Sequence, residues 1–414
     1  MKICAVICEF NPFHNGHKYV LEQAKEVSKC DAVLCVMSGN FVQRAEPSIA
    51  GKAFRTKTAL ENGAVFVVEL PVMFATMTGE LFSYGAINII NQVKNVTHLA
   101  FGSECGNIEQ LKKISNLQLS EEFNQKLRNL LKSGMSYSNA MSILSEVELK
   151  SNDILGIEYI KQLIKTGSNI EPIAIQRQKS DYNDAKLIKN FSSATAIRET
   201  IKNITAGEAG CHPHRIIKPN CKTECITTNC GRSLTAPTVD LSTLKSNVPN
   251  IDELIGQLTK HPVDYSLFEK LVITSIRNND NLSSLVDAGE GLEIKLKKNA
   301  LEYSNLEKIC EETKSKRYTM SRIKRLCLQS LFHITPQMLS KPTPIPLRVL
   351  GVKGDFKKHL NIFPKKNTII STKDYDKLKR KHFDYLKKEK EAENIFSLLT
   401  SSPSRFYSYQ LVVV

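Results

Sequence analysis

The first twenty-odd residues constrain this chain more than any other stretch. Residues 3–8 read ICAVIC, a short apolar run that predicts one buried strand. Asn11-Pro12 then interrupts the strand, because proline lacks a backbone donor and disfavours helix in the residue before it. Residues 19–27 carry apolar side chains at helical spacing, which predicts a helix packed back onto the strand. The predicted order is strand, tight turn and helix N-terminus, with the sequence HNGH at the turn.

This turn is suited to hold a nucleoside triphosphate. A helix N-terminus presents unpaired N–H groups and partial positive charge to phosphate, and Gly16 lets the backbone approach a ligand closely. His14 and His17 can donate hydrogen bonds to phosphoryl oxygens, and a protonated imidazole would add positive charge. No GxxxxGK[ST] stretch is present here, so the predicted site is not a P-loop. The alternative is that both histidines only cap a turn in an ordinary α/β protein.

Further buried strands follow, separated by helical patterns, and this alternation predicts a parallel α/β sheet. They are expected at residues 31–43, 65–71, 97–106 and 171–178. The ends of such strands form the ligand crevice of the sheet. Arg177 closes the last strand, where a guanidinium can make a forked contact with triphosphate oxygens. Glu69 could face the crevice or anchor a loop, and both interpretations remain open.

Two helix starts add candidate nucleotide contacts. Ser192, Ser193 and Thr195 precede a predicted helix, where small hydroxyl side chains and N–H groups can bind phosphate together. Arg198, one turn later, can add positive charge. Asn152 stands at the start of another apolar helix, where Ser151 or Asn152 is expected to be the N-cap. In each case an ordinary helix cap is the alternative to a ligand contact.

Positive charge is concentrated in the second half of the chain. Residues 1–200 contain 22 of the 57 Lys and Arg residues and 20 of the 42 Asp and Glu residues. Residues 201–414 therefore contain 35 basic and 22 acidic residues, which accounts for +13 of the net charge of +15. This distribution predicts that a polyanion such as RNA binds mainly to the second half, and a solubilising surface charge is the alternative. Candidate RNA contacts, in one basic helical region with an aromatic residue, are Lys316, Arg317, Tyr318, Arg322, Lys324 and Arg325.

The length of 414 residues exceeds what one core usually supports, so two domains are expected. We predict a nucleotide-binding domain over residues 1–205, a loop or linker over 206–248, and a mainly helical domain over 249–414. The linker favours a flexible insertion, with a zinc site as the alternative. Its potential zinc ligands are Cys211, His212, His214, Cys221, Cys225 and Cys230.

The cysteines and the apolar runs indicate the cell compartment. Eleven cysteines, an odd number spread through apolar runs, fit reduced thiols in a cytoplasmic protein. No apolar stretch approaches the roughly 20 residues needed to cross a bilayer, and the N-terminus lacks a secretory signal. We therefore expect a cytoplasmic protein with no membrane partner.

Several motifs together resemble one known family. HNGH is similar to the HxGH signature of the nucleotidyltransferase superfamily. The stretches EFNPFHNGH, SGNFVQRAEP, ELP, FGSE, SNDILGIEYI, QR, SSATAIRE and KRYTMSRIKR occur in the order found in the tRNA(Met) cytidine acetate ligase family. The resemblance spans residues 3–352, most of the chain. It implies a Rossmann-like HxGH nucleotidyltransferase domain with a parallel sheet, followed by a mainly helical, basic domain.

The resemblance also implies an activity and its site residues. Acetate would react with ATP to give acetyl-adenylate and pyrophosphate, and the wobble cytidine of elongator tRNA(Met) would accept the acetyl group on N4. His14, His17 and Arg177 would be catalytic, and a Mg²⁺ ion bridging the phosphates is expected, although no acidic pair identifies its ligands. ATP contacts are also implied at Gly102, Asn152, Ser192, Ser193 and Thr195. The first turn would contact ATP through Ile7, Cys8, Glu9, Phe10, Asn11, Pro12, Phe13, His14, Asn15, Gly16, His17, Lys18, Tyr19 and Val20.

One stretch departs from the family pattern. After Arg177 the family pattern leads to a Tyr-His pair, whereas this chain reads QKSDYND, with Tyr182 followed by Asn183. This departure keeps two alternatives open, a non-catalytic RNA-binding protein and a small-molecule adenylyltransferase with the same HxGH signature. Enzymes of the second kind are typically much shorter and do not need a basic second half.

Overall fold

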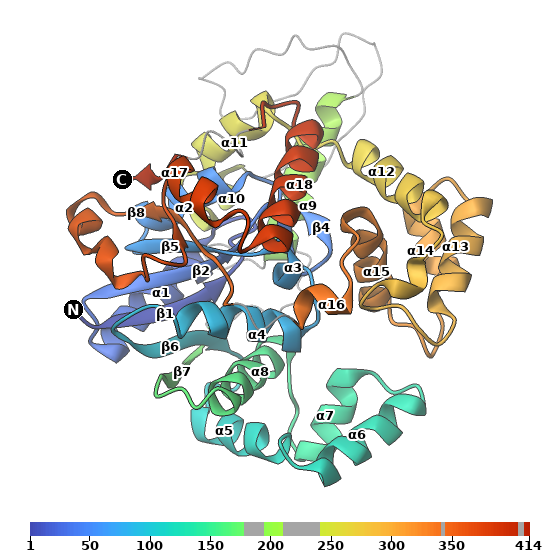
Figure 1. Cartoon of the computed structure of the whole chain (residues 1–414), viewed down its shortest axis with the longest axis horizontal. Helices are drawn as coiled ribbons and strands as arrows, with labels where there is room; N and C mark the ends of the chain where they lie inside the picture. The colour runs from blue at the N-terminus through green and yellow to red at the C-terminus, as the bar shows by residue number, and fades with distance from the viewer. Residues whose placement is uncertain (178–193, 210–240, 341–343, 405–409) are drawn as a thin grey trace.

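The computed structural model describes residues 1–177, 194–209, 241–340, 344–404 and 410–414. Its central element is a sheet in which strands alternate with helices through the first half of the chain (Figure 1). These elements are β1 (Ile3–Cys8), α1 (Asn15–Ser28), β2 (Ala32–Ser38), α2 (Lys52–Glu61), β5 (Phe66–Leu70), α3 (Val72–Ala75), α4 (Gly79–Ile90), β6 (Val96–Ser103), α8 (Ser151–Lys165) and β7 (Glu171–Gln176). The predicted strands are all present, and the α/β class is confirmed.

The strand order explains where a ligand can bind. The sheet runs β10-β8-β5-β2-β1-β6-β7. The pairs β5–β2, β2–β1, β1–β6 and β6–β7 are all parallel. The chain moves outward from β1 through β2 to β5, then crosses back and continues on the other side with β6 and β7. Strand order therefore reverses at β1, and the crevice at the carboxyl ends of β1 and β6 is the topological switch point where such sheets bind ligands.

Both faces of the sheet are buried, which is why β1 reads as a continuous apolar run. Alternate residues of β1 point to opposite faces. Ile3, Ala5 and Ile7 pack in the core that includes α4 and α8, whereas Cys4, Val6 and Cys8 pack in the core that includes α1 and α2. Strands covered on both faces are typical of parallel sheets with crossover helices.

The second half of the chain also contributes to this sheet. β8 (Leu347–Val352) pairs antiparallel with β5, and β9 (Thr368–Ile369) and β10 (Val412–Val413) pair parallel with β8. The apolar run that contains β8 is thus part of the sheet, within the half of the chain predicted to be mainly helical. The sheet consequently extends beyond the N-terminal 205 residues and includes the apolar C-terminal tail.

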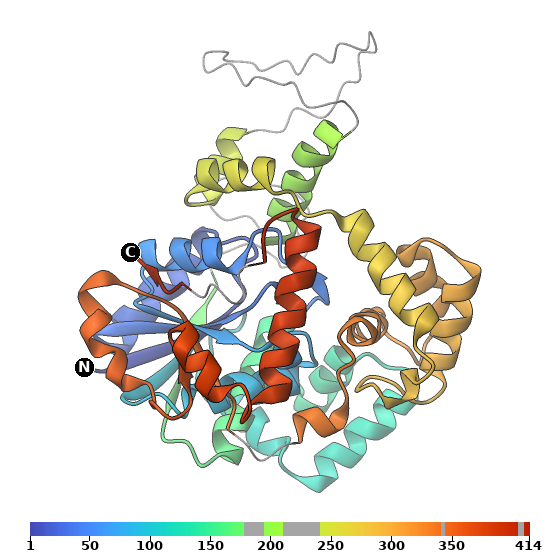
Figure 2. The same ribbon diagram turned by 45° about the horizontal axis from the view of Figure 1, so that its top comes forward.

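The remaining elements are mostly helical, both over residues 107–150 and, as predicted, over most of residues 249–414. α5 (Ile108–Leu117) packs beside α8, and α6 (Glu121–Lys132) and α7 (Tyr137–Ser145) extend from it (Figure 1). α18 (Phe383–Leu399) lies between the sheet and a second helical group (Figure 2). That group is α12 (Tyr265–Asn278), α13 (Leu292–Glu302), α14 (Leu306–Thr313) and α15 (Met320–Phe332). Shorter or more peripheral elements are β3 (Phe41–Val42), β4 (Glu46–Pro47), α9 (Ala194–Ala209), α10 (Leu241–Asn247), α11 (Ile251–Lys260), α16 (Pro336–Leu339) and α17 (Thr372–Leu378).

No helix in the described part of the chain combines the length and apolar character that a membrane crossing requires.

A buried arginine fixes the carboxyl ends of β1 and β2. Arg55 of α2 is 1% exposed, and it donates hydrogen bonds to the carbonyl oxygens of Glu9 (2.6 Å), Ser38 (3.1 Å) and Ala50 (3.0 Å), and also to that of Gly39. One side chain thus satisfies four carbonyl groups, three at the ends of β1 and β2 and one in the loop before α2. Burial lowers the pKa of Arg55 to about 10, so the guanidinium stays charged at neutral pH.

Replacing Arg55 should therefore destabilise the protein strongly. Arg55→Met leaves several buried carbonyls without a donor, and we expect the free energy of unfolding to fall by about 3 kcal/mol or more. Urea denaturation followed by circular dichroism measures this change. The matched control is Arg128→Met on exposed α6, where we expect a change of about 0.5 kcal/mol or less. Equal effects of the two substitutions would contradict the bracing role of Arg55.

Candidate nucleotide-binding site

A cavity of about 240 Å³ lies at the switch point of the sheet. Its walls come from the carboxyl ends of β1, β6 and β7, the N-terminus of α1, the loop after β2, and helices α4, α8 and α9. The lining residues are Val6, Ile7, Cys8, Glu9, Phe10, Asn11, His14, Gly16, His17, Tyr19, Val20, Gln43, Arg44, Phe82, Phe101, Gly102, Asn152, Leu155, Tyr159, Arg177, Ala194, Thr195 and Arg198.

The two histidines of HNGH form a reciprocal cap on the first turn of α1. His14 is the N-cap residue, and its Nδ1 accepts a hydrogen bond from the backbone N–H of Gly16 (3.1 Å). His17 Nδ1 accepts in turn from the backbone N–H of His14 (3.3 Å). The rings stack with centroids 3.7 Å apart. Because each Nδ1 is an acceptor, a neutral ring carries its proton on Nε2, where it is a hydrogen-bond donor.

Gly16 is required by this cap as well as by the ligand. A Cβ atom at position 16 would lie 2.9 Å from Cε1 and 3.0 Å from Nδ1 of the His14 ring. Such distances are too short for non-bonded atoms, so any side chain here would push the imidazole away. The absence of a side chain at Gly16 therefore leaves room for the imidazole of His14.

Both imidazoles are neutral in the unliganded protein. Burial, with a smaller effect from the positive charges of Arg177 and Arg198, lowers the pKa of His14 to about 3. Burial also holds the pKa of His17 well below its ordinary value, helped by His14 and the same two arginines. In this state the histidines are therefore neutral donors, and the added charge of a protonated imidazole during the reaction stays a prediction.

Arginines carry the positive charge of the cavity instead. Arg44, Arg177 and Arg198 line it, and Glu9 is the only carboxylate among its described lining residues. Arg198 is 6% exposed and donates to the carbonyl oxygen of Asn11 (2.8 Å) and to Thr195 Oγ1 (3.3 Å). The result is an excess of positive charge at a helix N-terminus, which suits a polyphosphate.

Glu9 connects this site to the loop after β2. Its Oε1 accepts from the backbone N–H of Gln43 (2.7 Å) and from Ser38 Oγ (3.3 Å). Burial raises the pKa of Glu9 above its ordinary value, against the lowering effect of the Gln43 hydrogen bond and of nearby arginines. Glu9 thereby holds Gln43 and Arg44 at the cavity wall.

Glu104 holds Asn152 at the opposite wall. Asn152 Nδ2 donates to Glu104 Oε1 (2.5 Å), and the backbone N–H groups of Asn152 and Asp153 donate to Glu104 Oε2 (both 3.1 Å). Since the amide nitrogen of Asn152 faces Glu104, its Oδ1 is the acceptor that this lining residue offers to a ligand. α8 begins at Ser151 with Lys150 in the N-cap position, so the expected capping role of Ser151 or Asn152 is wrong, and Glu104 caps the helix.

The structure brings together most of the predicted nucleotide contacts. Ten of the fourteen residues 7–20 line the cavity, together with Gly102, Asn152, Arg177 and Thr195. Four members of the predicted stretch lie outside the lining, namely Pro12, Phe13, Asn15 and Lys18. Ser192, Ser193 and the QKSDYND stretch lie outside the described residues, as do the Cys and His residues of 206–248.

Some lining residues have no local sequence signal. Phe82, Leu155 and Tyr159 occupy apolar helix positions that resemble any core residue, and only the packing of α4 and α8 places them at the cavity.

The two interpretations of Glu69 are also resolved. Its side chain is 1% exposed and paired with Lys52 (2.6 Å) and Arg348 (3.1 Å), so it anchors other elements rather than facing the crevice.

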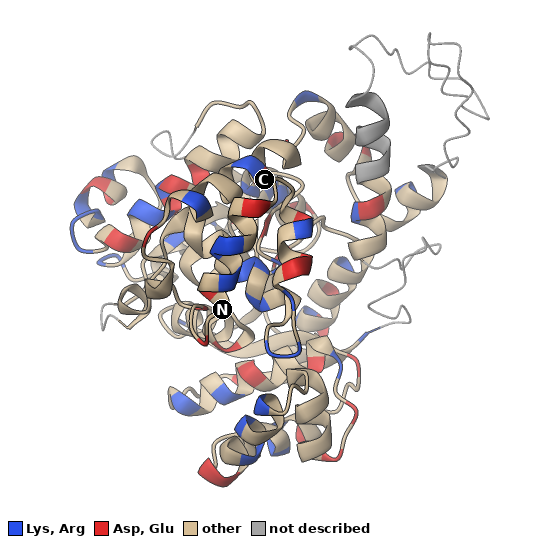
Figure 3. Ribbon diagram, turned by 90° about the vertical axis from the view of Figure 1, so that its right-hand side faces the viewer, with Lys and Arg blue, Asp and Glu red and all other residues tan. Residues whose placement is uncertain are grey.

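The predicted RNA contacts divide into two groups. Tyr318 is 8% exposed and donates its hydroxyl to the carbonyl oxygen of Glu290, so its ring is not available to stack on an exposed base. Arg322 pairs with Glu290 (2.8 Å), and Arg325 binds Asp287 through two nitrogens (3.0 and 2.9 Å). The exposed members of the set are Lys316, Arg317 and Lys324. Basic and acidic residues are interspersed on this side of the molecule (Figure 3).

The described residues contain no group of three or more His, Cys, Asp or Glu side chains positioned to hold a metal ion.

Comparisons with known proteins agree with this geometry. A family model described as HIGH Nucleotidyl Transferase matches residues 1–409. Proteins named tRNA(Met) cytidine acetate ligase from Thermoanaerobacter sp. (strain X514) and Clostridium perfringens are 34% and 35% identical, and each alignment covers at least 96% of both chains. A crystal structure of Thermotoga maritima TmcAL bound with alpha-thio ATP is similar over the full length of both chains, at 28% identity and a TM-score of 0.82. The apo form of that protein gives a TM-score of 0.84.

The tautomer and charge of the two imidazoles can be tested by nitrogen-15 NMR of the unliganded protein. We expect His14 to remain neutral and protonated on Nε2 at pH 5, and both His14 and His17 to do so at pH 6, where a histidine with a pKa of about 6.5 is mostly charged. Because folding lowers these pKa values, the free energy of unfolding should decrease as pH falls below about 6.5. An imidazolium signal from either residue at pH 6 would contradict this assignment.

The role of Glu104 can be tested through nucleotide affinity. Glu104→Ala releases the Asn152 amide, and we expect ATP binding, measured by calorimetry, to weaken roughly tenfold. Glu104→Gln keeps an acceptor oxygen and should weaken binding less. Glu109→Ala, at an exposed position of α5, is the control and should leave binding unchanged. Equal ATP affinity in all three variants would show that Glu104 does not position Asn152.

Proposed function

The chain belongs to the HIGH nucleotidyl transferase family and, within it, to the tRNA(Met) cytidine acetate ligases, and on this premise we propose that it acetylates N4 of the wobble cytidine of elongator tRNA(Met) at the expense of ATP. The observation that carries the proposal is the pair of neutral, capped imidazoles beside Arg177 in a cavity at the switch point. The match of the whole chain to ligases of this family argues against a small-molecule adenylyltransferase and against a non-catalytic RNA-binding protein.

The reaction proceeds in two balanced steps. An oxygen of acetate attacks the α-phosphorus of ATP, the bond to the β-phosphate oxygen breaks, and pyrophosphate leaves. The N4 amine of cytidine then attacks the carbonyl carbon of acetyl-adenylate, AMP leaves, and N4 loses a proton. Neither step requires a nucleophile from the protein, so positioning and charge stabilisation account for the protein's contribution.

The lining residues have distinct roles in the first step. His14 and His17 donate Nε2–H to phosphoryl oxygens, and because both rings are fixed by the α1 cap, they need not reorganise as charge develops. Arg177 and Arg198 offset the negative charge of the triphosphate, with the hydroxyl of Thr195 as a further donor. Ser192 and Ser193 extend this phosphate-binding stretch, and Gly102 and Asn152 contact the nucleoside.

Magnesium enters as part of the substrate. The described cavity lining offers a single carboxylate, Glu9, whereas protein sites for Mg²⁺ usually provide one or two carboxylates together with substrate phosphates. We therefore propose that Mg²⁺ binds mainly to the phosphates of ATP, and no residue of the chain is assigned as its main ligand.

The exposed Lys316, Arg317 and Lys324 are the proposed contacts to tRNA phosphates. The proposed site of the reaction is the cytoplasm, where tRNA is found.

An assay with ATP, acetate and tRNA(Met) transcripts tests the function. We expect acetate-dependent exchange of pyrophosphate into ATP and formation of N4-acetylcytidine at the wobble position, detected by mass spectrometry. His14→Ala and His17→Ala should each lower kcat about 100-fold or more, while tRNA binding by filter retention is unchanged. Exchange that does not depend on acetate, or full acetylation by both alanine variants, would refute the proposal.

A further inference from the structure

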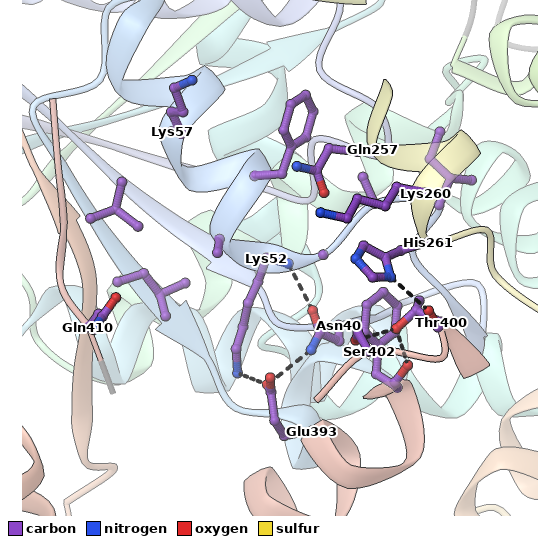
Figure 4. Close-up of a pocket in the computed structure, with 18 of the residues that line it drawn as sticks. Asn40, Lys52, Lys57, Gln257, Lys260, His261, Glu393, Thr400, Ser402 and Gln410 are labelled. Carbon is purple, nitrogen blue, oxygen red and sulfur yellow. Dashed lines mark hydrogen bonds and ion pairs between the residues drawn. The ribbon is translucent and has the colours of Figure 1, made fainter. Parts of the chain in front are cut away.

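A second and larger cavity, of about 540 Å³, lies on the α2 side of the sheet. Figure 4 shows side chains converging on it from elements that are far apart in the sequence. The walls are the loop after β2, the start of α2, the end of α11, the end of α18, and the strands β8 and β10. Its size falls within the range of small-molecule sites, roughly 300–1,000 Å³. None of the functions assigned above uses it.

The floor of this cavity is a buried ion cluster. Lys52 binds Glu69 (2.6 Å) and Glu393 (3.0 Å), and Arg348 binds Glu69 (3.1 Å). Asn40 fastens the cluster, since its Nδ2 donates to Glu393 (3.1 Å) and its Oδ1 accepts from the backbone N–H of Lys52 (2.8 Å). Two cations and two carboxylates thus balance each other in a fixed arrangement.

A further carboxyl group behind the floor does not change this balance. Glu389 is buried near Glu69, and burial together with that neighbour raises its pKa to about 8. It is therefore mainly protonated at neutral pH. The floor as a whole is polar but carries no net charge.

The rim adds a small positive excess. Lys57 pairs with Glu253 (2.6 Å), and Lys260 projects toward Gln257 (Figure 4). Counting the ionic floor and these three charged rim residues gives a net charge of about +1. The lining also includes apolar side chains, contributed by Ile49, Phe54, Leu258, Leu350 and Phe396.

This combination matches one nucleotide within an RNA chain. Apolar walls with an aromatic ring accept the faces of a base, amide and hydroxyl groups such as Gln257 and Ser402 can pair with its edges, and one surplus cation offsets one phosphodiester. ATP fits this charge poorly, because its triphosphate carries several negative charges and has the arginine-rich cavity at β1.

The two cavities share a wall, which supports an RNA occupant. The loop between β2 and α2 places Gln43 and Arg44 at the nucleotide cavity and Asn40 and Ile49 at the second one. The loop is tied to the first turn, because Asn11 Oδ1 accepts from the backbone N–H of Ile49 (2.8 Å). An RNA that presents one base to the first cavity can thus place another nucleotide in its neighbour.

We propose that the second cavity binds a nucleotide of the RNA substrate other than the cytidine that is acetylated. The inference rests on the proposed function for the identity of the RNA. It adds a recognition site formed jointly by α2, α11 and the C-terminal elements, separate from the exposed lysines and arginine of the α14–α15 region.

Two substitutions test the cavity by different physical means. Ala53→Trp places a bulky ring in the cavity from an exposed position of α2 without removing a charge, and Lys260→Glu reverses the surplus charge. Each should weaken binding of an anticodon stem-loop RNA about tenfold, measured by fluorescence anisotropy. Lys260→Arg should bind RNA like the unaltered protein, since it retains the charge.

The control is Lys94→Glu, an exposed lysine that precedes β6 and is not part of the cavity lining, and it should leave the affinity within about twofold. Acetate-dependent pyrophosphate exchange should be unchanged in all four variants, because the first cavity is intact. Absence of exchange in the unaltered protein would refute the proposed function. By contrast, if Ala53→Trp and Lys260→Glu bind RNA as tightly as the unaltered protein, the cavity assignment is refuted. A third outcome would also overturn the inference. If the unaltered protein binds CMP, and Ala53→Trp abolishes CMP binding but leaves RNA affinity unaffected, the cavity binds a free nucleotide instead.

Discussion

The nucleotide site depends on two hydrogen bonds from the backbone to the imidazoles of HNGH. The N–H of Gly16 binds His14 Nδ1, and the N–H of His14 binds His17 Nδ1, so the first turn of α1 and both rings form one unit. Helix caps usually use hydroxyl, amide or carboxylate side chains. An imidazole in this position has a second nitrogen, and that nitrogen is left as a donor of fixed direction. The residues that cap the helix are therefore also the proposed catalytic donors.

This arrangement separates hydrogen bonding from charge. Burial keeps both imidazoles neutral, and the positive field of the cavity comes from Arg44, Arg177 and Arg198. A guanidinium remains charged in such surroundings, whereas a buried imidazolium beside Arg177 and Arg198 would be disfavoured. Neutral donors next to permanent cations can thus bind a polyphosphate over a wide range of pH.

The two halves of the chain are joined by a buried ion cluster at the edge of the parallel strands. Lys52 and Glu69 belong to the first half, and Arg348 and Glu393 to the second. β8 carries Arg348 into the sheet, and α18 carries Glu393 against α2. The basic half is consequently built into the sheet rather than attached to it by a linker alone, which places the second cavity between elements of both halves.

Local sequence determined the strand–turn–helix at the N-terminus, the parallel strands and most residues of the first cavity. These features could be predicted because a buried strand, a proline break and helical spacing each depend on residues that are neighbours in the sequence. It could not determine the state of His14, since the pKa of an imidazole depends on burial and on arginines that come from β7 and α9. Tyr318 and Glu69 show the same limit: a tyrosine in a basic stretch and a carboxylate at a strand end look functional until packing buries one and pairs the other. Only the tertiary structure decided the second cavity, because its walls come from segments up to 372 residues apart, Asn40 and Val412, and no local pattern records that proximity.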